Sequence, residues 1–219
     1  MRSGSPLFSR LGVERLNAFS DGVFAIAATL LVLDLRTPEN LTPEQFRADL
    51  HHDIPSMLTY LLSFAVVGIF WVRHHQILSL ARAVSPGLLL LNLLFLALIA
   101  LIPFPTSLLG NYYNDPLAPA FYATVVGCAD VINMGLMLFI SRRPDLRRPG
   151  VHPALVRAHL LRPGLSGLIA FASVPVAYLV SAGAAELTWL LLIPVRLLVS
   201  RHVHRRVAGQ ADDQEEPRR

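Results

Sequence analysis

Lysine is missing from this chain of 219 residues, and every basic side chain other than histidine is an arginine. Charged residues make up only 16% of the sequence, whereas 53% of it is hydrophobic. The single cysteine, Cys128, excludes an intrachain disulfide and a cysteine-rich metal site, and we expect it to act as a small packing residue. This balance of few charges and many apolar residues is typical of an integral membrane protein.

The sequence motifs of common enzymes are also missing. The chain has no phosphate-binding Walker loop, no Gly-x-Ser-x-Gly elbow and no His-Glu-x-x-His zinc motif, so we predict that it is not an enzyme. Histidine pairs such as His51-His52 and His74-His75 do not complete a metal site, because adjacent side chains point apart on a helix and no carboxylate or cysteine lies at ligand spacing. We predict no metal and no cofactor.

Six apolar blocks are long enough, or nearly so, to cross a membrane. A helical span needs roughly 20 residues, because about 30 Å of hydrocarbon is covered at 1.5 Å per residue. Helices are the expected structure, since backbone polar groups must be paired internally in lipid. The sixth block is the weakest, being short and containing Pro194 and Arg196. The blocks are residues 16–35, 54–72, 86–109, 117–140, 164–182 and 186–200. We predict an all-α membrane protein with six transmembrane helices.

The arginines lie mainly in alternate connections between these blocks, which predicts both termini in the cytoplasm. An odd number of spans would break this alternation, so the pattern supports the sixth span. The basic charge therefore reflects membrane topology, and we expect no nucleic-acid partner. We predict a cytoplasmic tail over residues 1–15, a six-helix domain over 16–200, and a basic, then acidic cytoplasmic tail over 201–219. A short amphipathic helix starting near Thr42 is expected on the external side. The arginine bias and the single repeat favour a bacterial plasma membrane.

The first block joins a polar start to an aliphatic helix. A charge near lipid costs roughly 2.5–3.5 kcal/mol on insertion scales, so intramembrane charges usually face protein or water. The polar residues here are Arg15, Ser20 and Asp21. Two stripes follow, one aliphatic (Phe19, Val23, Ile26, Leu30 and Leu33) and one of small residues (Ala18, Gly22, Ala25 and Thr29). The aliphatic stripe either contacts lipid or lines a symmetric axis, where branched side chains can constrict a pore. Periodicity does not choose between these two interpretations.

The string Arg15-x-x-x-Phe19-Ser20-Asp21 at the start of a first membrane helix resembles the signature of the transmembrane protein 175 family. The later string Phe70-Trp71-x-x-His74-His75 is similar to the end of that family's second helix. The resemblance covers most of the chain, with its six spans, internal termini and short acidic first loop. It implies a potassium-permeable channel, and the single six-helix unit implies a homotetramer whose first helix lines a central pore.

The resemblance also implies roles for single residues. Ile26, Leu30 and Leu33 match the aliphatic positions that form the narrow region, and Thr29 matches a hydroxyl position used in ion selectivity. The matching polar residues hold neighbouring helices together by hydrogen bonds, and we expect Arg15 and Asp21 to serve assembly rather than touch ions. The residues of this inter-helix network are Arg15, Phe19, Ser20, Asp21, Trp71, His74 and His75.

The Thr-Val-Gly-Tyr-Gly filter of other potassium channels is absent. A channel without it must select with helix side chains, so we predict a leak-like channel with a moderate preference for potassium over sodium. The expected partners are further copies of the chain, membrane lipids and permeant potassium ions. Two alternatives remain: an ion- or proton-coupled secondary transporter, and a non-conducting membrane scaffold. Asp130, the other intramembrane acid, fits a proton relay, an ion path or a packing network with Asn133.

Overall fold

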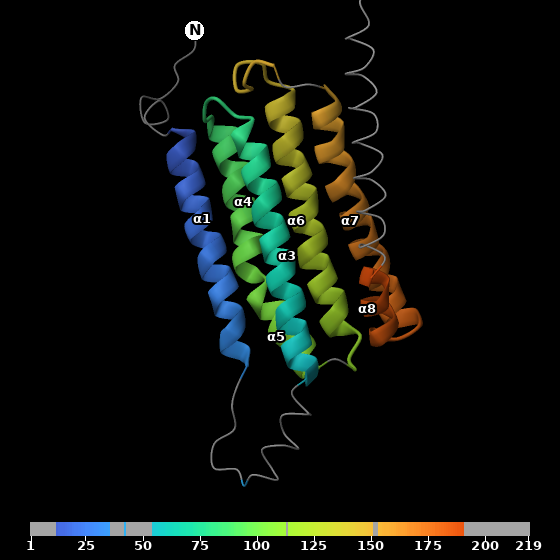
Figure 1. The fold of residues 1–219 in the computed structure, drawn as a ribbon. Helices are drawn as coiled ribbons and strands as arrows, with labels where there is room; N and C mark the ends of the chain where they lie inside the picture. Colours follow the sequence, from blue (N-terminus) through green and yellow to red (C-terminus); the bar gives the residue numbers. More distant parts are fainter. Residues whose placement is uncertain (1–11, 36–41, 43–53, 113, 151–152, 191–219) are drawn as a thin grey trace, which may run out of the picture.

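The computed structural model describes residues 12–35, 42, 54–112, 114–150 and 153–190. Within these residues the chain is helical, and the one extended pairing is an isolated bridge between Ala81 and Arg147. The helices form one bundle with α1 at one edge and α7 and α8 at the other (Figure 1). They are α1 (Val13–Leu30), η2 (Leu31–Asp34), α3 (Ile54–Ser79), α4 (Pro86–Leu101), α5 (Pro103–Asn111), α6 (Leu117–Ser141), α7 (Pro153–Leu179) and α8 (Ala182–Leu190).

Four helical stretches of the described chain are long and apolar enough to cross a membrane. They are Val13–Leu33, Ile54–Ser79, Pro86–Asn111 and Leu117–Ser141, and they cover the first four predicted blocks. This confirms the prediction of an all-helical membrane protein. The fifth predicted block coincides with the second part of α7, where Gly164–Leu179 forms a shorter apolar helix. Most of the sixth block, the external helix after Thr42, and nearly all of both tails lie outside the described residues.

The second span is longer than the sequence analysis predicts. Its helix, α3, does not end at residue 72 but continues to Ser79. The reason is packing: Ile77 and Leu78 are fully buried and continue the inward face that Phe70 begins. Arg73 therefore lies inside the helix rather than in a cytoplasmic loop, and the predicted end of this span is wrong.

The third span bends near its lower end. Ser85 caps the start of α4 by accepting a hydrogen bond from the backbone N–H of Leu88 at 3.3 Å. At the other end Pro103 has no backbone N–H, so the helix tightens, and the N–H of Ile102 bonds the carbonyl of Ile99 at 3.1 Å. The chain then continues directly into α5. The hydroxyl of Thr106 bonds the Ile102 carbonyl at 2.9 Å and so supports the bend.

Close contact between α6 and α7 depends on small residues. A Cβ atom added to Gly127 would lie 2.8 Å from the ring of Phe171, and one added to Gly167 would lie 3.3 Å from the Cβ of Asp130. Membrane helices are held together largely by such van der Waals packing, because lipid supplies no hydrophobic driving force between them. A side chain at Gly127 would displace the ring of Phe171 from the surface of α6.

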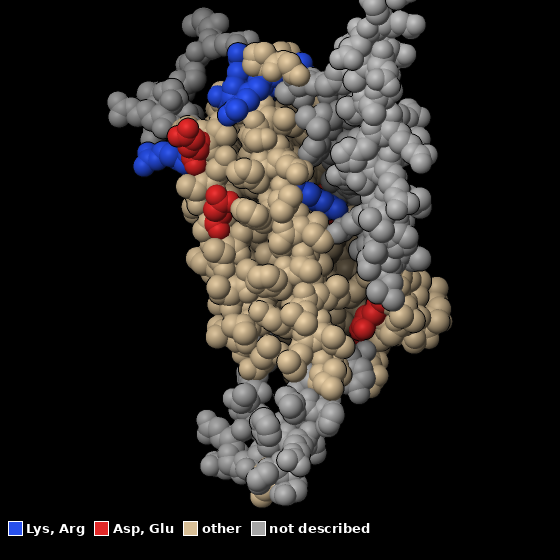
Figure 2. Space-filling view, viewed as in Figure 1, with Lys and Arg blue, Asp and Glu red and all other residues tan. Residues whose placement is uncertain are grey.

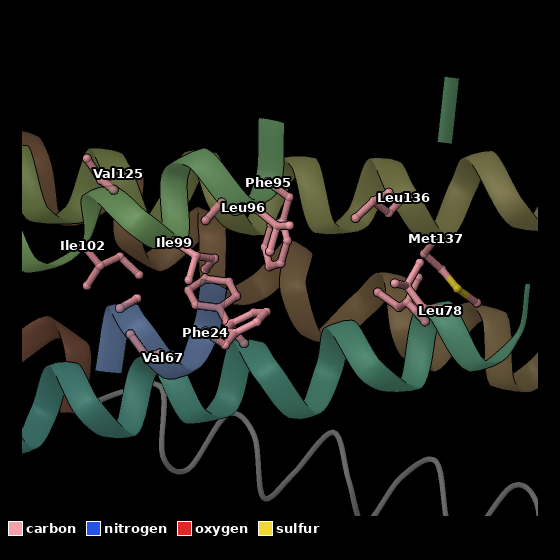
Figure 3. Close-up of a cluster of buried hydrophobic side chains, with 14 of the residues drawn as sticks. Phe24, Val67, Leu78, Phe95, Leu96, Ile99, Ile102, Val125, Leu136 and Met137 are labelled. Carbon is pink, nitrogen blue, oxygen red and sulfur yellow. The ribbon is translucent and has the colours of Figure 1, made fainter. Parts of the chain in front are cut away.

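The core lies where α1, α3, α4 and α6 meet. Fully or almost fully buried side chains from all four helices interlock there, as Figure 3 shows for ten labelled residues. Phe24 of α1 lies with its ring centroid 6.0 Å from that of Phe95 of α4, and Phe70 of α3 meets the same ring edge-on at 5.9 Å. This aromatic group fixes the inner face of α1 and therefore decides which of its faces stays outside.

Candidate functional site

The inner face of α1 is a narrow stripe that packs against α3 and α4. The stripe consists of Leu16, Ser20, Phe24, Ala27 and Leu31, all of them buried. Their spacing of three and four residues places them on one side of the helix. Val13, Val23 and Ala28 flank this stripe and are partly buried against the core, and the rest of the α1 surface is available to lipid, water or another copy of the chain.

Four of the five residues of the aliphatic stripe predicted from periodicity lie on this outer surface, whereas Val23 is partly buried against the core. Ile26 is 61% exposed, Leu30 42% and Leu33 69%, and Phe19 at the polar end of the stripe is 55% exposed. Thr29 is exposed beside them, and its hydroxyl donates a hydrogen bond to the carbonyl of Ile26 at 2.9 Å. The hydroxyl oxygen therefore keeps its lone pairs free for an outside partner. Large apolar residues gathered on one helix face suit either a membrane or a constriction.

A buried chain of hydrogen bonds ties the inner face of α1 to α3 and α4. The side-chain amide of Asn92 donates to the hydroxyl of Ser20 at 3.2 Å, and the hydroxyl donates in turn to the Leu16 carbonyl at 2.8 Å. The Asn92 carbonyl oxygen lies 2.6 Å from Nε2 of His74. The His74 ring stacks on Phe95, with centroids 5.1 Å apart and planes 10° apart. These polar groups are satisfied within the core, so they act in positioning the helices.

A second link joins α1 to α3 on the outer side. The indole N–H of Trp71 donates to a carboxylate oxygen of Asp21 at 2.8 Å, and the His75 ring lies 6.2 Å from the Trp71 ring. Arg15 is exposed, and it forms no ion pair with Asp21 within the described chain. The reason is helix geometry: six residues at 100° each leave the two side chains about 120° apart around α1. One chain therefore brings Trp71 to Asp21 but leaves Arg15 apart from it.

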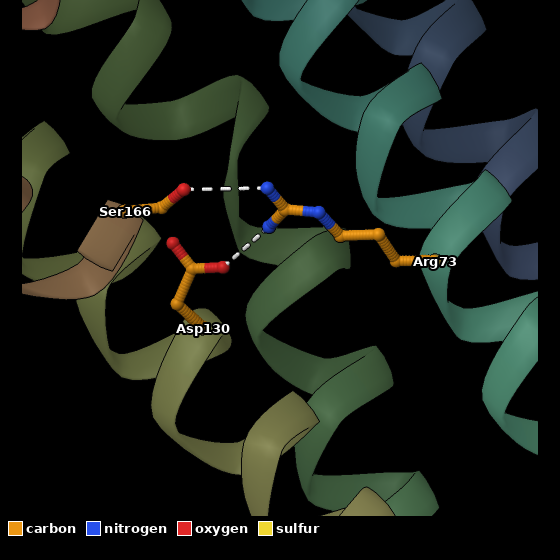
Figure 4. Close-up of polar contacts among 3 residues, drawn as sticks. All are labelled: Arg73, Asp130 and Ser166. Atoms are coloured by element: carbon orange, nitrogen blue, oxygen red, sulfur yellow. Dashed lines mark hydrogen bonds and ion pairs between the residues drawn. The ribbon is translucent and has the colours of Figure 1, made fainter. Parts of the chain in front are cut away.

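The same turn of α3 carries a buried ion pair that the sequence analysis missed. Arg73 donates through Nη1 to Asp130 of α6 at 2.8 Å and through Nη2 to the hydroxyl of Ser166 of α7 at 3.2 Å (Figure 4). The side chains of Arg73 and Asp130 are 12% and 2% exposed. Such a pair offsets the cost of burying each charge. The sequence does contain a sign that the helix continues past Arg73. Ile77 and Leu78 are spaced from Phe70 so that they continue the same apolar helix face.

Asp130 therefore pairs with an arginine, and the alternative of a network with Asn133 is not formed. The side chain of Asn133 is fully buried, and neither its nitrogen nor its oxygen has a hydrogen-bond partner in the described chain. Among the described residues no three histidine, cysteine, aspartate or glutamate side chains lie together as a metal site would require.

Comparison with known proteins places this arrangement in a family. Residues 15–103 match the family model described as endosomal/lysosomal potassium channel TMEM175, a range that includes α3, α4 and all of α1 except its first two residues. A Streptomyces collinus protein named as a potassium channel is 37% identical over 172 residues, which cover 74% of this chain and 84% of that protein.

The chain belongs to the TMEM175 family. The matched range contains Ser20, Asp21, Trp71, His74 and Asn92, so the links that hold α1 to α3 and α4 all fall within it. Asp130 and Ser166 lie outside it, although their partner Arg73 lies inside.

Two further TMEM175 relatives extend the comparison. The crystal structure of a protein described as a lysosomal potassium-selective channel TMEM175 homolog from Chamaesiphon minutus matches with a TM-score of 0.71 and 28% identity, over 85% of this chain and 97% of that one. The mouse protein named endosomal/lysosomal proton channel TMEM175 is 32% identical over 76% of this chain, but the match covers only 37% of the mouse protein. Relatives in this family thus carry names for two different permeant ions.

Proposed function

We propose that four copies of this chain form a leak-like, potassium-permeable channel whose central pore is lined by α1. The observation that carries the proposal is the exposure of Ile26, Leu30 and Leu33 on the outer face of a helix that the TMEM175 family model covers. One chain cannot enclose a path for ions with one exposed helix face. Symmetric copies that turn this face inward stack the three side chains into rings, roughly one helical turn or less apart.

Rings of branched side chains restrict a pore by excluding water rather than by binding ions. In this proposal Ile26, Leu30 and Leu33 form the constriction, and the Thr29 hydroxyl offers oxygen atoms to a partly dehydrated cation. One hydroxyl per subunit replaces a hydration shell less completely than a cage of carbonyls does. The proposed preference for potassium over sodium is therefore moderate.

The polar residues at the upper end of α1 position it for this task. Ser20 and Asp21 are held by α4 and α3 of the same chain, so the outer face of α1 has a fixed direction. Arg15 points away from Asp21 within one chain, and we propose that it reaches the Asp21 of a neighbouring copy. Phe19 and His75, exposed beside these groups, would then lie at the contact between copies.

The proposed setting is a bacterial plasma membrane crossed six times, with both termini in the cytoplasm. The chain would then comprise an N-terminal tail over residues 1–15, a channel domain over 16–200 and a C-terminal tail over 201–219. The support is the arginine pattern along the whole sequence and the four spanning helices among the described residues.

The test is ion flux from liposomes that contain the purified protein and a potassium gradient, for the native chain, Ile26→Asn and Leu168→Asn. Leu168 of α7 is 65% exposed and lies about as far along its helix as Ile26 does, roughly 20 Å, so it controls for a polar residue in lipid. We expect potassium flux to exceed sodium flux, Ile26→Asn to raise conductance or reduce selectivity, and Leu168→Asn to leave both unchanged.

Four results would contradict the proposal. The first is no flux from a verified tetramer, which favours a scaffold. The second is slow flux that saturates and follows a coupling gradient, which favours a transporter. The third, read with a pH-sensitive dye in the same liposomes, is proton flux without potassium flux. Equal effects of both asparagine variants would show that Ile26 faces lipid.

A further inference from the structure

The two loops at one end of the bundle form a single docked unit. The backbone N–H of Arg82 bonds the carbonyl of Leu146 at 2.8 Å, and the N–H of Arg148 bonds the carbonyl of Leu80, also at 2.8 Å. Ala81, between them, is fully buried, and Leu146 is 4% exposed. The loop after α3 and the loop after α6 therefore share one ordered surface.

This surface is strongly basic. It carries five arginines, and the one acid in the same two loops, residues 80–85 and 141–150, is Asp145. Figure 2 shows the blue side chains gathered at this end of the molecule. We call the group the arginine cluster; its members are Arg82, Arg142, Arg143, Arg147 and Arg148.

The arginine cluster is held in place by neutral groups. Arg82 Nε donates to the Asp145 carbonyl at 2.9 Å, Arg148 Nε to the Ala81 carbonyl at 3.2 Å, and Arg147 Nη1 to the Ser141 carbonyl at 3.2 Å. These bonds orient the guanidinium groups and leave most of their five N–H donors free. In the part of the chain that the structure describes, no carboxylate forms an ion pair with any member.

A contact with an aromatic ring orients Arg143, a further member of the arginine cluster, without neutralising its charge. The Arg143 guanidinium lies 4.6 Å from the centre of the Phe139 ring, whose edge fills the space beside Gly87. Arg142 is exposed. Among the described residues, the cluster thus presents oriented guanidinium groups that no carboxylate neutralises, and such groups match the oxygens of a phosphate better than a flexible ammonium does.

The position of the arginine cluster indicates that the phosphate it suits is that of a lipid headgroup. Arg142 follows α6 directly, and Arg82 comes three residues after α3 ends, so both lie within a few ångströms of the ends of membrane-spanning helices. Lipid headgroups occupy a layer roughly 5–7 Å thick at that level. The first half of α4, which follows the loop directly, exposes the aliphatic side chains of Leu90, Leu93 and Leu94. A ligand here meets guanidinium groups at one end and an aliphatic surface at the other.

We propose that the arginine cluster binds the phosphate of an anionic phospholipid, with the acyl chains of that lipid along α4. The site needs only the membrane setting of the chain, so it stands or falls separately from ion conduction. The cluster discriminates between lipids because a zwitterionic headgroup brings its own cation to the phosphate, whereas phosphatidylglycerol does not.

The test uses the full-length protein in phosphatidylcholine bilayers with a trace of spin-labelled lipid, and measures by electron paramagnetic resonance how much label the protein immobilises. We expect spin-labelled phosphatidylglycerol to be retained about threefold or more over spin-labelled phosphatidylcholine. The double variant Arg142→Gln/Arg148→Gln should bring that ratio close to one. Asp145→Asn removes the opposing charge, keeps the backbone carbonyl that Arg82 uses, and should raise the ratio.

The two variants are expected to shift the ratio in opposite directions, following the charge that each one removes, and a general loss of structure does not predict that pattern. An unchanged ratio in both variants overturns the proposal. So does full competition by millimolar inorganic phosphate, which would make the cluster a site for soluble anions. Phosphatidylglycerol preference that survives inorganic phosphate and is lost with the two arginines supports a lipid site.

Discussion

At the scale of single residues, the bond between Trp71 and Asp21 decides how α1 meets α3 on the exposed side of the bundle. A hydrogen bond to a charged group contributes about 1.5–3 kcal/mol, but both partners here are exposed, so we expect about 1 kcal/mol. Trp71→Phe should therefore lower the thermal unfolding midpoint of the purified protein modestly. In an Asp21→Leu background the same change should cost almost nothing, since the acceptor is already gone. Equal costs in both backgrounds would assign the effect to lost packing.

Thr29 offers a second test at this scale, because it is the polar member of the proposed pore surface. Thr29→Val keeps the shape and removes the hydroxyl. We expect the ratio of potassium to sodium permeability to fall by about threefold, the equivalent of one weak hydrogen bond. Thr29→Ser restores a hydroxyl and should restore the ratio. The measurement is the reversal potential of the reconstituted protein under bi-ionic conditions. A ratio unchanged by Thr29→Val would move selectivity away from α1.

Residue patterns predicted the faces of α1 well and the partners of its polar groups poorly. Spacing alone placed Ile26, Leu30 and Leu33 on one face, and the structure leaves that face exposed. No pattern in the sequence pointed to Asn92, whose side chain is the hydrogen-bond partner of both Ser20 and His74. A single asparagine in an apolar run gives no sign of which helix it faces, since that depends on how the helices pack.

At the scale of helices, one turn of α3 connects four neighbouring helices. Trp71 reaches α1, His74 reaches α4, and Arg73 reaches α6 and α7. Trp71 and Arg73 can point to nearly opposite sides because two residues turn a helix by about 200°. Because the second apolar block ends at residue 72, the sequence pattern places Arg73 in the connection that follows it. Only the burial of its carboxylate partner, on a helix distant in sequence, changes that assignment.

The buried ion pair of Arg73 and Asp130 predicts how the stability of the bundle changes when one or both charges are removed. Removing one partner leaves the other charge buried, so Asp130→Leu alone should destabilise the protein by about 3–5 kcal/mol. The double variant Arg73→Met/Asp130→Leu replaces both charges with apolar groups and should recover most of that loss. The readouts are the unfolding midpoint and the potassium flux. Recovered stability with flux still abolished would mean that Asp130 lies on an ion path.

At the scale of the whole molecule, the fold class follows directly from composition and block length, whereas the assembly depends on surfaces that only a structure reveals. The four helical stretches that are long and apolar enough to cross a membrane coincide with the first four apolar blocks, because a membrane imposes one minimum length on every span. The bend at Pro103 and the docking of two loops at the arginine-rich end were not predicted. Both depend on contacts between segments far apart in the chain.

The number of α1 helices around the proposed pore is the property of the assembly that most needs a measurement. The chain has one cysteine, so Cys128→Ser provides a background in which Leu33→Cys, at the most exposed position of the aliphatic stripe, is the only thiol. A cationic, membrane-impermeant thiol reagent should block flux through this variant. It should leave flux through Leu168→Cys in the same background unchanged.

Co-expression of Leu33→Cys subunits with subunits that lack this cysteine then allows the number of subunits around the pore to be counted. If one modified Leu33→Cys subunit closes the pore, the flux that survives the reagent equals the unmodified fraction raised to the number of subunits. At equal expression of both chains, a tetramer should keep about one-sixteenth of its flux and a dimer about one-quarter. Survival of about one-half would mean that each chain conducts alone, through a path of its own that Leu33 reaches. That result would contradict a pore shared by the α1 helices of several copies.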